Sequence, residues 1–216
     1  SYIVRIVPAL LRGAGVTLAL FALVFPLSLP LGFLVTLCAN CRFKPVKWLA
    51  EAYIFVMRGT PLMLQLFFFY YGLPFLPGIG QYLRLSSFAA AALSFTLNYA
   101  AYFAEIFRGG LLSIDRGQYE VSHVLGLTSF QTMTRIIIPQ MIRVTLPSIG
   151  NEAITLVKDT ALVASIALPE LLHYAKGIVT RDFTTTPFIV AAFIYLLITF
   201  VVTVLFKFAE RKTNYE

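Results

Sequence analysis

The sequence predicts an all-α integral membrane protein with five transmembrane helices and one short cytoplasmic helix. Only 12% of its 216 residues are charged and 59% are hydrophobic, whereas soluble domains carry about 25% charged residues. Four runs of 20 to 29 residues contain no Lys, Arg, Asp or Glu. Each is long enough to span the bilayer, since a helix needs about 20 apolar residues to do so. The runs are Gly13–Cys41, Gly59–Leu83, Leu85–Ala104 and Phe183–Phe206.

A fifth helix is expected between Arg143 and Glu170. The 26 intervening residues are apolar except for small polar groups and three ionisable residues, Glu152, Lys158 and Asp159. Charges at bilayer depth are costly unless they face protein or water, so this helix should have a polar interior face. We place the five spans at about 10–38, 48–73, 86–112, 136–168 and 187–209, in a single domain over 1–216.

The first two spans contain prolines that disturb a regular helix. Pro26 and Pro30 in the first span remove backbone donors and should bend it. In the second span, Thr60 can cap a helix and Pro61 suits the first helical position. The segment from Pro61 to Gly72 is too short to span alone, which predicts a broken helix lining a cavity. A helix that begins at the membrane surface fits equally well.

The third span places polar residues on one face. Asn98, Tyr102 and Glu105 follow an i, i+4, i+7 spacing. Between the fourth and fifth spans a loop is expected around 169–186. The last span ends in a basic tail that begins at Lys207.

No catalytic, metal or cofactor site is expected. The chain has no GxxxxGK[ST] loop that would cradle ATP. His123 and His173 fall in different loops, and Cys38 with Cys41 has no second cysteine pair to complete a metal site. The net charge of +7 reports orientation in a membrane protein, so no nucleic-acid partner is expected. A passive channel or a stand-alone membrane enzyme remains the alternative of a different class.

The distribution of basic residues predicts an N-terminus outside and a C-terminus in the cytoplasm. Five spans place the termini on opposite sides, and cytoplasmic loops carry the excess of Lys and Arg. With the N-terminus outside, ten basic residues are cytoplasmic and five are external. The cytoplasmic ones are Arg42, Lys44, Lys47, Arg108, Arg116, Arg135, Arg143, Lys207, Arg211 and Lys212; the external ones are Arg5, Arg12, Arg84, Lys176 and Arg181.

A polar segment interrupts the hydrophobic chain before the fourth span. Asp115 is placed to start a short helix, on which Val121, Val124 and Leu125 share one side. Gly126 then permits a left-handed conformation. Such a cytoplasmic helix suits docking into a groove of another protein. A helix lying at the membrane interface is an equally good interpretation of these residues alone.

The spacing of this segment resembles a known family. Glu120-Val121-Ser122, three residues, Gly126, nine residues and Ile136-Ile137-Ile138-Pro139 follow the EAA loop, EAA-x3-G-x9-I-x-L-P. That loop marks the permease subunits of bacterial ABC importers. Val121 and Ser122 replace two alanines and Ile138 replaces a leucine, all small or isosteric changes at a packing surface.

The resemblance extends over nearly the whole chain and points to the polar amino acid permease branch. The matching stretches are Arg58-Gly59-Thr60-Pro61 with Gln65, Ala101–Gly110, Gly117–Glu120, Lys158-Asp159-Thr160 and Pro169–Leu172. The resemblance implies a type I ABC importer fold in the bacterial plasma (inner) membrane. It also implies four kinds of partner: a second permease subunit, identical or related; two ATPase subunits that bind ATP and Mg²⁺; an extracytoplasmic substrate-binding protein; and membrane lipid.

The resemblance assigns roles to two groups of residues. The coupling loop, residues 115–139, is expected to dock on the ATPase and transmit its closure to the fourth span as alternating access. Its expected contact residues are Gly117, Glu120, Ser122, His123 and Gly126. Structural or gating roles are expected for Arg58, Pro61, Glu105, Arg108 and Lys158.

The expected substrate contacts are Asn98, Tyr102, Glu152 and Asp159. Ionisable residues inside a membrane are functional candidates by default. Three acids against one lysine in this region favour a basic amino acid as substrate. Asn98 would hold its carboxylate, and Glu152 or Asp159 its cationic groups. Glutamine or another polar amino acid is the alternative.

Overall fold

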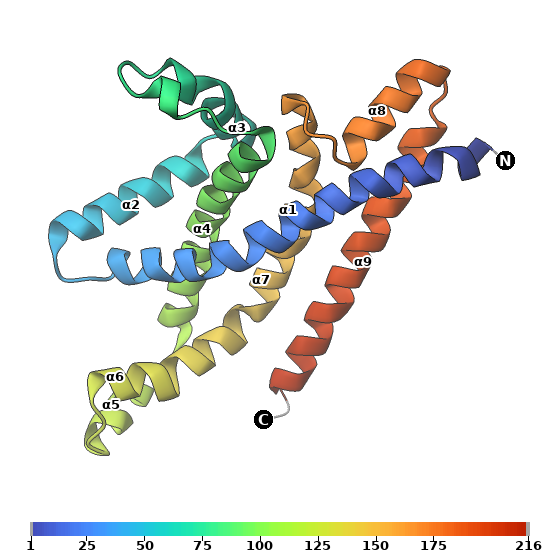
Figure 1. Cartoon of the computed structure of the whole chain (residues 1–216). Helices are drawn as coiled ribbons and strands as arrows, with labels where there is room; N and C mark the ends of the chain where they lie inside the picture. Colours follow the sequence, from blue (N-terminus) through green and yellow to red (C-terminus); the bar gives the residue numbers. More distant parts are fainter. Residues whose placement is uncertain (1, 215–216) are drawn as a thin grey trace.

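The computed structural model describes residues 2–214, and all regular structure in that range is helical (Figure 1). The α-helices are α1 (Tyr2–Ala39), α2 (Lys44–Gly59), α3 (Leu62–Phe67), α4 (Ser87–Ser113), α5 (Arg116–Val124), α6 (Ser129–Thr132), α7 (Ile138–Asp159), α8 (Leu171–Asp182) and α9 (Thr186–Asn214). Two π-helical segments, η1 (Phe68–Gly72) and η4 (Met133–Ile137), and three 3₁₀ segments, η2 (Leu73–Phe75), η3 (Gly80–Tyr82) and η5 (Thr160–Ile166), join them.

Two helices are long and apolar enough to cross a membrane on their own. They are Tyr2–Ala39 and Thr186–Thr213, and a third candidate is the bent pair Lys44–Gly59 and Leu62–Phe75. α4 and α7 have 27 and 22 residues, enough to cross, but both contain charged side chains. Length and composition of the described helices therefore give two or three spans, and the expected five remain a proposal.

α1 begins earlier than the sequence suggested. It starts at Tyr2 rather than near residue 10, and it continues as one α-helix across Pro8, Pro26 and Pro30. The residues before Arg12 are part of the helix because Ile6 and Leu10 are buried in a cluster with α8 and α9. The charge-free run did not reveal this first part of the helix, since Arg5 and Arg12 interrupt it.

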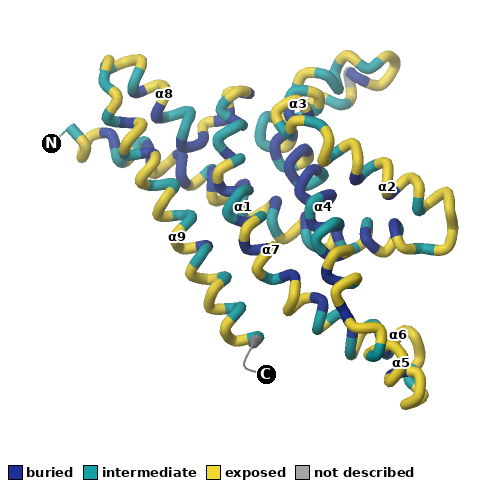
Figure 2. Tube along the Cα trace, turned by 180° about the vertical axis from the view of Figure 1, so that it is seen from behind, coloured by how far each residue is buried: buried dark blue, intermediate teal, exposed yellow. Residues whose placement is uncertain are grey.

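α4 lies at the centre of the fold and is covered on several sides. Its buried residues include many alanines (Ala90, Ala91, Ala100, Ala101 and Ala104), and small side chains allow neighbouring helices to approach closely. One close approach is at Gly32 of α1, where an added Cβ would lie 2.7 Å from the Cβ of Phe103. Figure 2 shows α4 largely buried, while α9 is largely exposed along its length.

The segment predicted as the second span contains a break, which fits a broken span or a re-entrant loop. α2 ends at Gly59, and the axis of the following segment is bent by 104°. The detail of the break differs from the prediction. Thr60 terminates α2, its hydroxyl donating to the Val56 carbonyl, and Pro61 is the residue before α3 rather than its first helical residue.

Residues 171–182, where a loop was expected, form helix α8. The side chain of Glu170 caps its N-terminus by accepting a 2.7 Å hydrogen bond from the His173 backbone N–H. Leu171, Ala175 and Ile178 are buried at i, i+4, i+7, the pattern of an amphipathic helix. The short length of this apolar stripe hid it among the polar residues of the segment.

α5 and α6 project from one end of the molecule (Figures 1 and 2). Both views place α8 and the N-terminus toward the opposite end, while α9 runs from the α8 end to a C-terminus on the α5 side (Figures 1 and 2). α5 and α6 are also mostly exposed, so they form a separate feature outside the helical core.

Candidate functional site

A cavity of about 410 Å³ opens between the break after α2, the middle of α4 and the second half of α7. Ligand pockets typically have volumes of about 300–1,000 Å³. Its lining consists of Arg58, Gly59, Thr60, Pro61, Leu62, Asn98, Tyr99, Tyr102, Glu152, Thr155 and Asp159. The structure thus brings together all four predicted substrate contacts, which come from two helices far apart in sequence. We call this cavity the central pocket.

The central pocket contains two carboxylates without a cationic partner. Glu152 and Asp159 lie two turns apart on one face of α7, as their spacing of seven predicts. Asp159 accepts a 2.7 Å hydrogen bond from the hydroxyl of the buried Tyr99. Neither carboxylate forms an ion pair within residues 2–214. A ligand cation would therefore supply the missing partner.

Asn98 lies at the pocket wall, but its amide nitrogen already donates hydrogen bonds within the protein. It is 4% exposed, and its amide nitrogen donates to the Met57 carbonyl at 2.9 Å and to Oε1 of Gln65 at 3.1 Å. Gln65 in turn donates to the Met57 carbonyl and to the Thr60 hydroxyl. An amide nitrogen has two hydrogens, so Asn98 has none left for the carboxylate it was expected to hold. Instead it fastens the break after α2 to α4.

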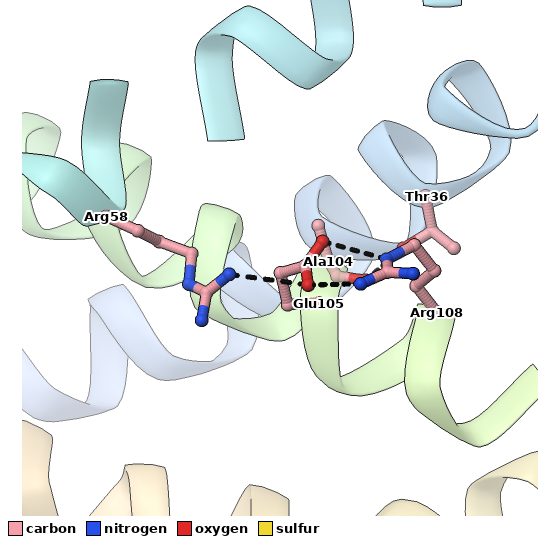
Figure 3. A network of polar contacts seen from close by, with 5 residues as sticks. All are labelled: Thr36, Arg58, Ala104, Glu105 and Arg108. Carbon is pink, nitrogen blue, oxygen red and sulfur yellow. Dashed lines mark hydrogen bonds and ion pairs between the residues drawn. The ribbon is translucent and has the colours of Figure 1, made fainter. Parts of the chain in front are cut away.

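Next to the pocket, Glu105 holds two arginines from different helices (Figure 3). Arg108, one turn along α4, donates two hydrogen bonds to its carboxylate, at 2.9 and 2.7 Å. Arg58, at the end of α2, approaches the same carboxylate from the other side with an N–O distance of 3.3 Å. The predicted pair of Glu105 and Arg108 is therefore present, and Arg58 is a third member that spacing did not indicate.

Arg58 stands between two cavities. Besides the central pocket it lines a neighbouring cavity of about 380 Å³, whose wall also includes Lys47, Glu51, Glu105 and Arg108. Its guanidinium lies 5.5 Å from the centre of the Tyr102 ring, within range of a cation–π contact. The central pocket is the better candidate site because its carboxylates are unpaired, whereas those of the neighbouring cavity have partners.

Several pocket residues were not predicted as substrate contacts. Arg58 and Pro61 were expected to be structural or gating, and Tyr99 and Thr155 were not singled out. Thr155 lies between Glu152 and Asp159 at helical spacing, so the face of α7 would have identified it. Lys158 does not line the pocket and is exposed. Tyr99 follows from no sequence pattern, since its contact with Asp159 joins two helices 60 residues apart.

The coupling loop contains the short helix predicted to start at Asp115. The Asp115 carboxylate caps α5 by accepting from the Gly117 N–H, and the helix ends in a left-handed Gly126 with φ of 73°. The N–H of Leu127 bonds to the Ser122 carbonyl and that of Gly126 to the His123 carbonyl, which is the Schellman termination.

α5 presents an exposed apolar edge and buries one of the predicted contact residues. Val121, Val124 and Leu125 are 59%, 86% and 70% exposed, although apolar side chains usually pack away from water. Glu120 and His123 are exposed as well. Ser122 is fully buried, and its hydroxyl donates to the Gln118 carbonyl. Ser122 therefore stabilises α5 from within and is closed to an outside partner in this structure.

No group of three or more His, Cys, Asp and Glu residues within 2–214 is arranged to hold a metal ion. His123 is on α5 and His173 on α8, helices that lie toward opposite ends of the molecule. The two features that the described residues offer are the polar central pocket and the exposed helix α5.

Comparison with known proteins gives a family match over most of the chain. Residues 28–215 match the family described as the binding-protein-dependent transport system inner membrane component. The arginine transport system permease protein ArtQ of Bacillus subtilis is 37% identical over 208 residues, covering 95% of this chain and 93% of that protein. The L-cystine transport system permease protein TcyB of the same organism is 35% identical, covering 96% and 87%.

A solved structure has the same arrangement of helices. It is a crystal structure of an amino acid ABC transporter with histidines, which is 33% identical to this chain. The superposition has a TM-score of 0.88 and covers 98% of this chain and 97% of the other.

Proposed function

Because this chain belongs to the family of binding-protein-dependent transport system inner membrane components, we propose that it is a permease subunit of an ATP-driven amino acid importer. Family membership makes it a multi-pass inner membrane protein and implies a substrate-binding protein and an ATPase as partners. It is not itself an ATPase. ATP is bound by the partner, and the chain contributes a path through the membrane.

The transported molecule is an amino acid with a cationic side chain. The observation that carries this proposal is the pair of unpaired carboxylates in the central pocket, Glu152 and Asp159. A basic amino acid brings two cations, its α-ammonium and its side chain, and a buried charge needs a partner. The similarity to an arginine permease supports the same class, whereas the similarity to a cystine permease makes a neutral amino acid the alternative.

The proposed topology has five spans, with the N-terminus outside and the C-terminus in the cytoplasm. α1, the broken α2–α3 segment, α4, α7 and α9 would be the spans. The excess of basic residues on the cytoplasmic side supports this orientation. The positions of α5 and the C-terminus toward one end of the molecule, and of α8 toward the other, agree with it.

The coupling step would run from α5 into α7. The exposed apolar edge of α5 offers a partner a surface for a helix-in-groove contact, and the left-handed turn at Gly126 returns the chain toward α6 and α7. α7 carries Glu152 and Asp159, so a displacement of α5 would move one wall of the central pocket. A ligand is coupled to such a change only if its contacts differ between the two states.

A second permease subunit, either a copy of this chain or a relative, would complete the path. The central pocket is not fully enclosed by this chain, so a second subunit could complete its wall. The two subunits would each place an α5 on one ATPase of a pair, so that closure of the ATPases draws both coupling loops together.

Transport assays test the proposal directly. The chain is co-purified with its ATPase and second permease subunit, reconstituted in proteoliposomes, and supplied with its binding protein and internal ATP. We expect ATP-dependent uptake of radiolabelled arginine, lysine or histidine that exceeds uptake of glutamine. A complex with an ATPase inactivated in hydrolysis is the control. Uptake of neither these amino acids nor cystine would contradict the amino acid assignment, and uptake of glutamine or cystine alone would contradict the basic one.

A further inference from the structure

The central pocket has one cation in its wall, and no role in substrate recognition has been assigned to it. Of the lining residues Arg58 alone is a Lys or Arg, facing a pocket that also contains Glu152 and Asp159. A basic amino acid has the complementary pattern, with one carboxylate and two cationic groups. Since Asn98 has spent its amide donors on Met57 and Gln65, another group must receive the substrate carboxylate.

We propose that Arg58 binds the α-carboxylate of the transported amino acid and that Glu105 is the positioning residue that holds Arg58 in place. This inference rests on the proposed function. It assigns a role to Arg58, the third charged residue of the pocket besides Glu152 and Asp159. It separates the part of the ligand common to all amino acids, read by Arg58, from the variable side chain, read by Glu152 and Asp159.

The geometry around Glu105 leaves Arg58 available and Arg108 occupied. Arg108 donates from two nitrogens to both carboxylate oxygens. Arg58 contacts only one of these oxygens, through Nη1 at 3.3 Å. A guanidinium carries five N–H donors in a fork that matches a carboxylate. Its remaining donors can therefore form the two parallel bonds typical of an arginine–carboxylate pair.

Tyr102 and the end of α2 limit where the guanidinium can go. The Tyr102 ring lies 5.5 Å from Cζ of Arg58 and lines the same pocket. Arg58 is in the last turn of α2, directly before the 104° bend that Asn98 and Gln65 fasten to α4. The ion pair with Glu105 and the contact with the face of the Tyr102 ring hold the Arg58 side chain at the pocket wall, which reduces the entropy lost when the substrate binds.

The position of Glu105 also explains why Arg58 does not neutralise the pocket itself. A free arginine beside two unpaired carboxylates would pair with one of them and compete with a cationic substrate. Arg58 is instead paired with Glu105, and it forms no ion pair with Glu152 or Asp159. The pocket wall therefore carries one cationic and two anionic side chains, and the cationic one is paired with Glu105.

The test compares each amino acid with its α-carboxamide, which is nearly isosteric but neutral at that position. Binding of arginine, argininamide, glutamine and glutaminamide is measured on the solubilised complex of permease and ATPase, without binding protein. In the unmodified complex we expect the amide to bind at least about tenfold more weakly, roughly 1.4 kcal/mol. In Arg58→Gln the acid and the amide should differ by no more than about twofold, the usual margin of additivity.

Arg108→Gln is the matched control. It removes an arginine from the same carboxylate but not from the pocket wall, so discrimination between acid and amide should remain. Because each variant is compared with the unmodified complex for the same two ligands, intrinsic differences between acid and amide cancel. Glu105→Gln should reduce the discrimination partly, since Arg58 keeps its charge and loses its anchor.

Three results overturn the inference. The first is that the unmodified complex binds acid and amide equally. The second is that Arg58→Gln discriminates between them as well as the unmodified complex does. The third is that Arg108→Gln loses discrimination to the same extent as Arg58→Gln. If Arg58→Gln does not assemble, Arg58→Lys replaces it, and unchanged discrimination in both Arg58→Lys and Glu105→Gln is then the contradicting result. Binding of neither amino acid to the unmodified complex overturns the proposed function itself, which distinguishes the two failures.

Discussion

Glu152 and Asp159 are two acids on one helix face that line the central pocket, and neither forms an ion pair in the described part of the chain. Glu51 is paired with Lys47, Glu105 with two arginines and Asp182 with Arg181. Asp182 lies outside the proposed spans, and its bonds from Arg181 and Tyr2 lower its pKa. The two pocket acids have only a tyrosine hydroxyl, on Asp159, in place of a cation.

Removing either pocket charge should weaken transport of basic amino acids. We expect Asp159→Asn or Glu152→Gln to lower uptake of arginine, lysine and histidine at least about tenfold. A cation left without its buried partner costs about 2–5 kcal/mol, and tenfold is below that range. Uptake of a neutral amino acid should fall less. Glu51→Gln is the control, because Glu51 lies outside the central pocket. Parental uptake in both pocket variants would make these acids structural and remove the basis for a cationic substrate.

Gly32 of α1 lies so close to α4 that there is no room for a side chain larger than a hydrogen atom. A Cβ at this position would lie 2.7 Å from the Cβ of Phe103 and 2.8 Å from the carbonyl oxygen of Ala100. The second neighbour is backbone, which cannot rotate away. α1 and α4 can therefore pack at their present separation only with glycine here.

Gly32→Ala should destabilise the protein and Gly15→Ala should not. Overpacking typically costs about 1–3 kcal/mol, which outweighs the roughly 1 kcal/mol that alanine gains over glycine inside a helix. Gly15 is on the same helix, but an added Cβ there would have no neighbouring atom within 4 Å, so only the favourable term applies. Thermal unfolding in detergent measures both. An equal or higher midpoint for Gly32→Ala would mean that α1 and α4 separate easily.

At the level of elements, α5 depends on its two ends. Asp115 supplies a side-chain cap at the start, and the left-handed Gly126 closes the last turn. Its nine residues are too few for a stable isolated helix, so these ends and the packing of Ser122 hold the shape that a docking partner would meet. Glu120 contributes an exposed charge without an ion pair in the described part of the chain.

Changing either feature should uncouple ATP hydrolysis from transport. Proline fixes φ near −65° and cannot adopt the 73° of Gly126, so Gly126→Pro should misdirect α5. Gly126→Asn, which tolerates a positive φ, should retain activity, and Glu120→Arg should disturb docking by reversing a charge. The measurement is stimulation of ATPase activity by loaded binding protein in liposomes. Gly177→Ala, in open space on α8, is the control. Normal stimulation in both Gly126→Pro and Glu120→Arg would rule out this coupling role.

Sequence patterns predicted elements well where one local cause decides the structure. Asp115 and Gly126 mark the two ends of α5, and the Thr60-Pro61 pair marks the break after α2. α8 was missed because its helicity depends on a buried face against α1 and α9, which lie far away in the chain. The pocket residues were also predictable only where a local pattern places them. The face shared by Glu152 and Asp159 was visible, whereas Tyr99, Gln65 and the inward position of Arg58 arise from contacts between helices.

On the scale of the whole molecule, the proposed orientation places the pocket between the ATPase on one side of the membrane and the binding protein on the other. In this proposal α5 faces the ATPase in the cytoplasm, and α8 faces the side from which the binding protein delivers substrate. The helices place α5 and α8 toward opposite ends (Figure 1). With the N-terminus outside, the basic residues divide ten to five in favour of the cytoplasm, the asymmetry expected from the positive-inside rule.

Cysteine labelling in intact cells tests this orientation. Single cysteines replace Lys44, His123 and Lys176 in a background where Cys38 and Cys41 are changed to serine. Lys44 begins α2, His123 is exposed on α5 and Lys176 is exposed on α8, so reagent access depends on the side of the membrane. We expect an impermeant maleimide to label position 176 alone, and all three positions to react once the membrane is permeabilised. Labelling at 44 and 123 but not at 176 would invert the topology. Labelling at 123 and 176 together in intact cells would show that an even number of spans separates α5 from α8, and would contradict α7 as a membrane-crossing helix.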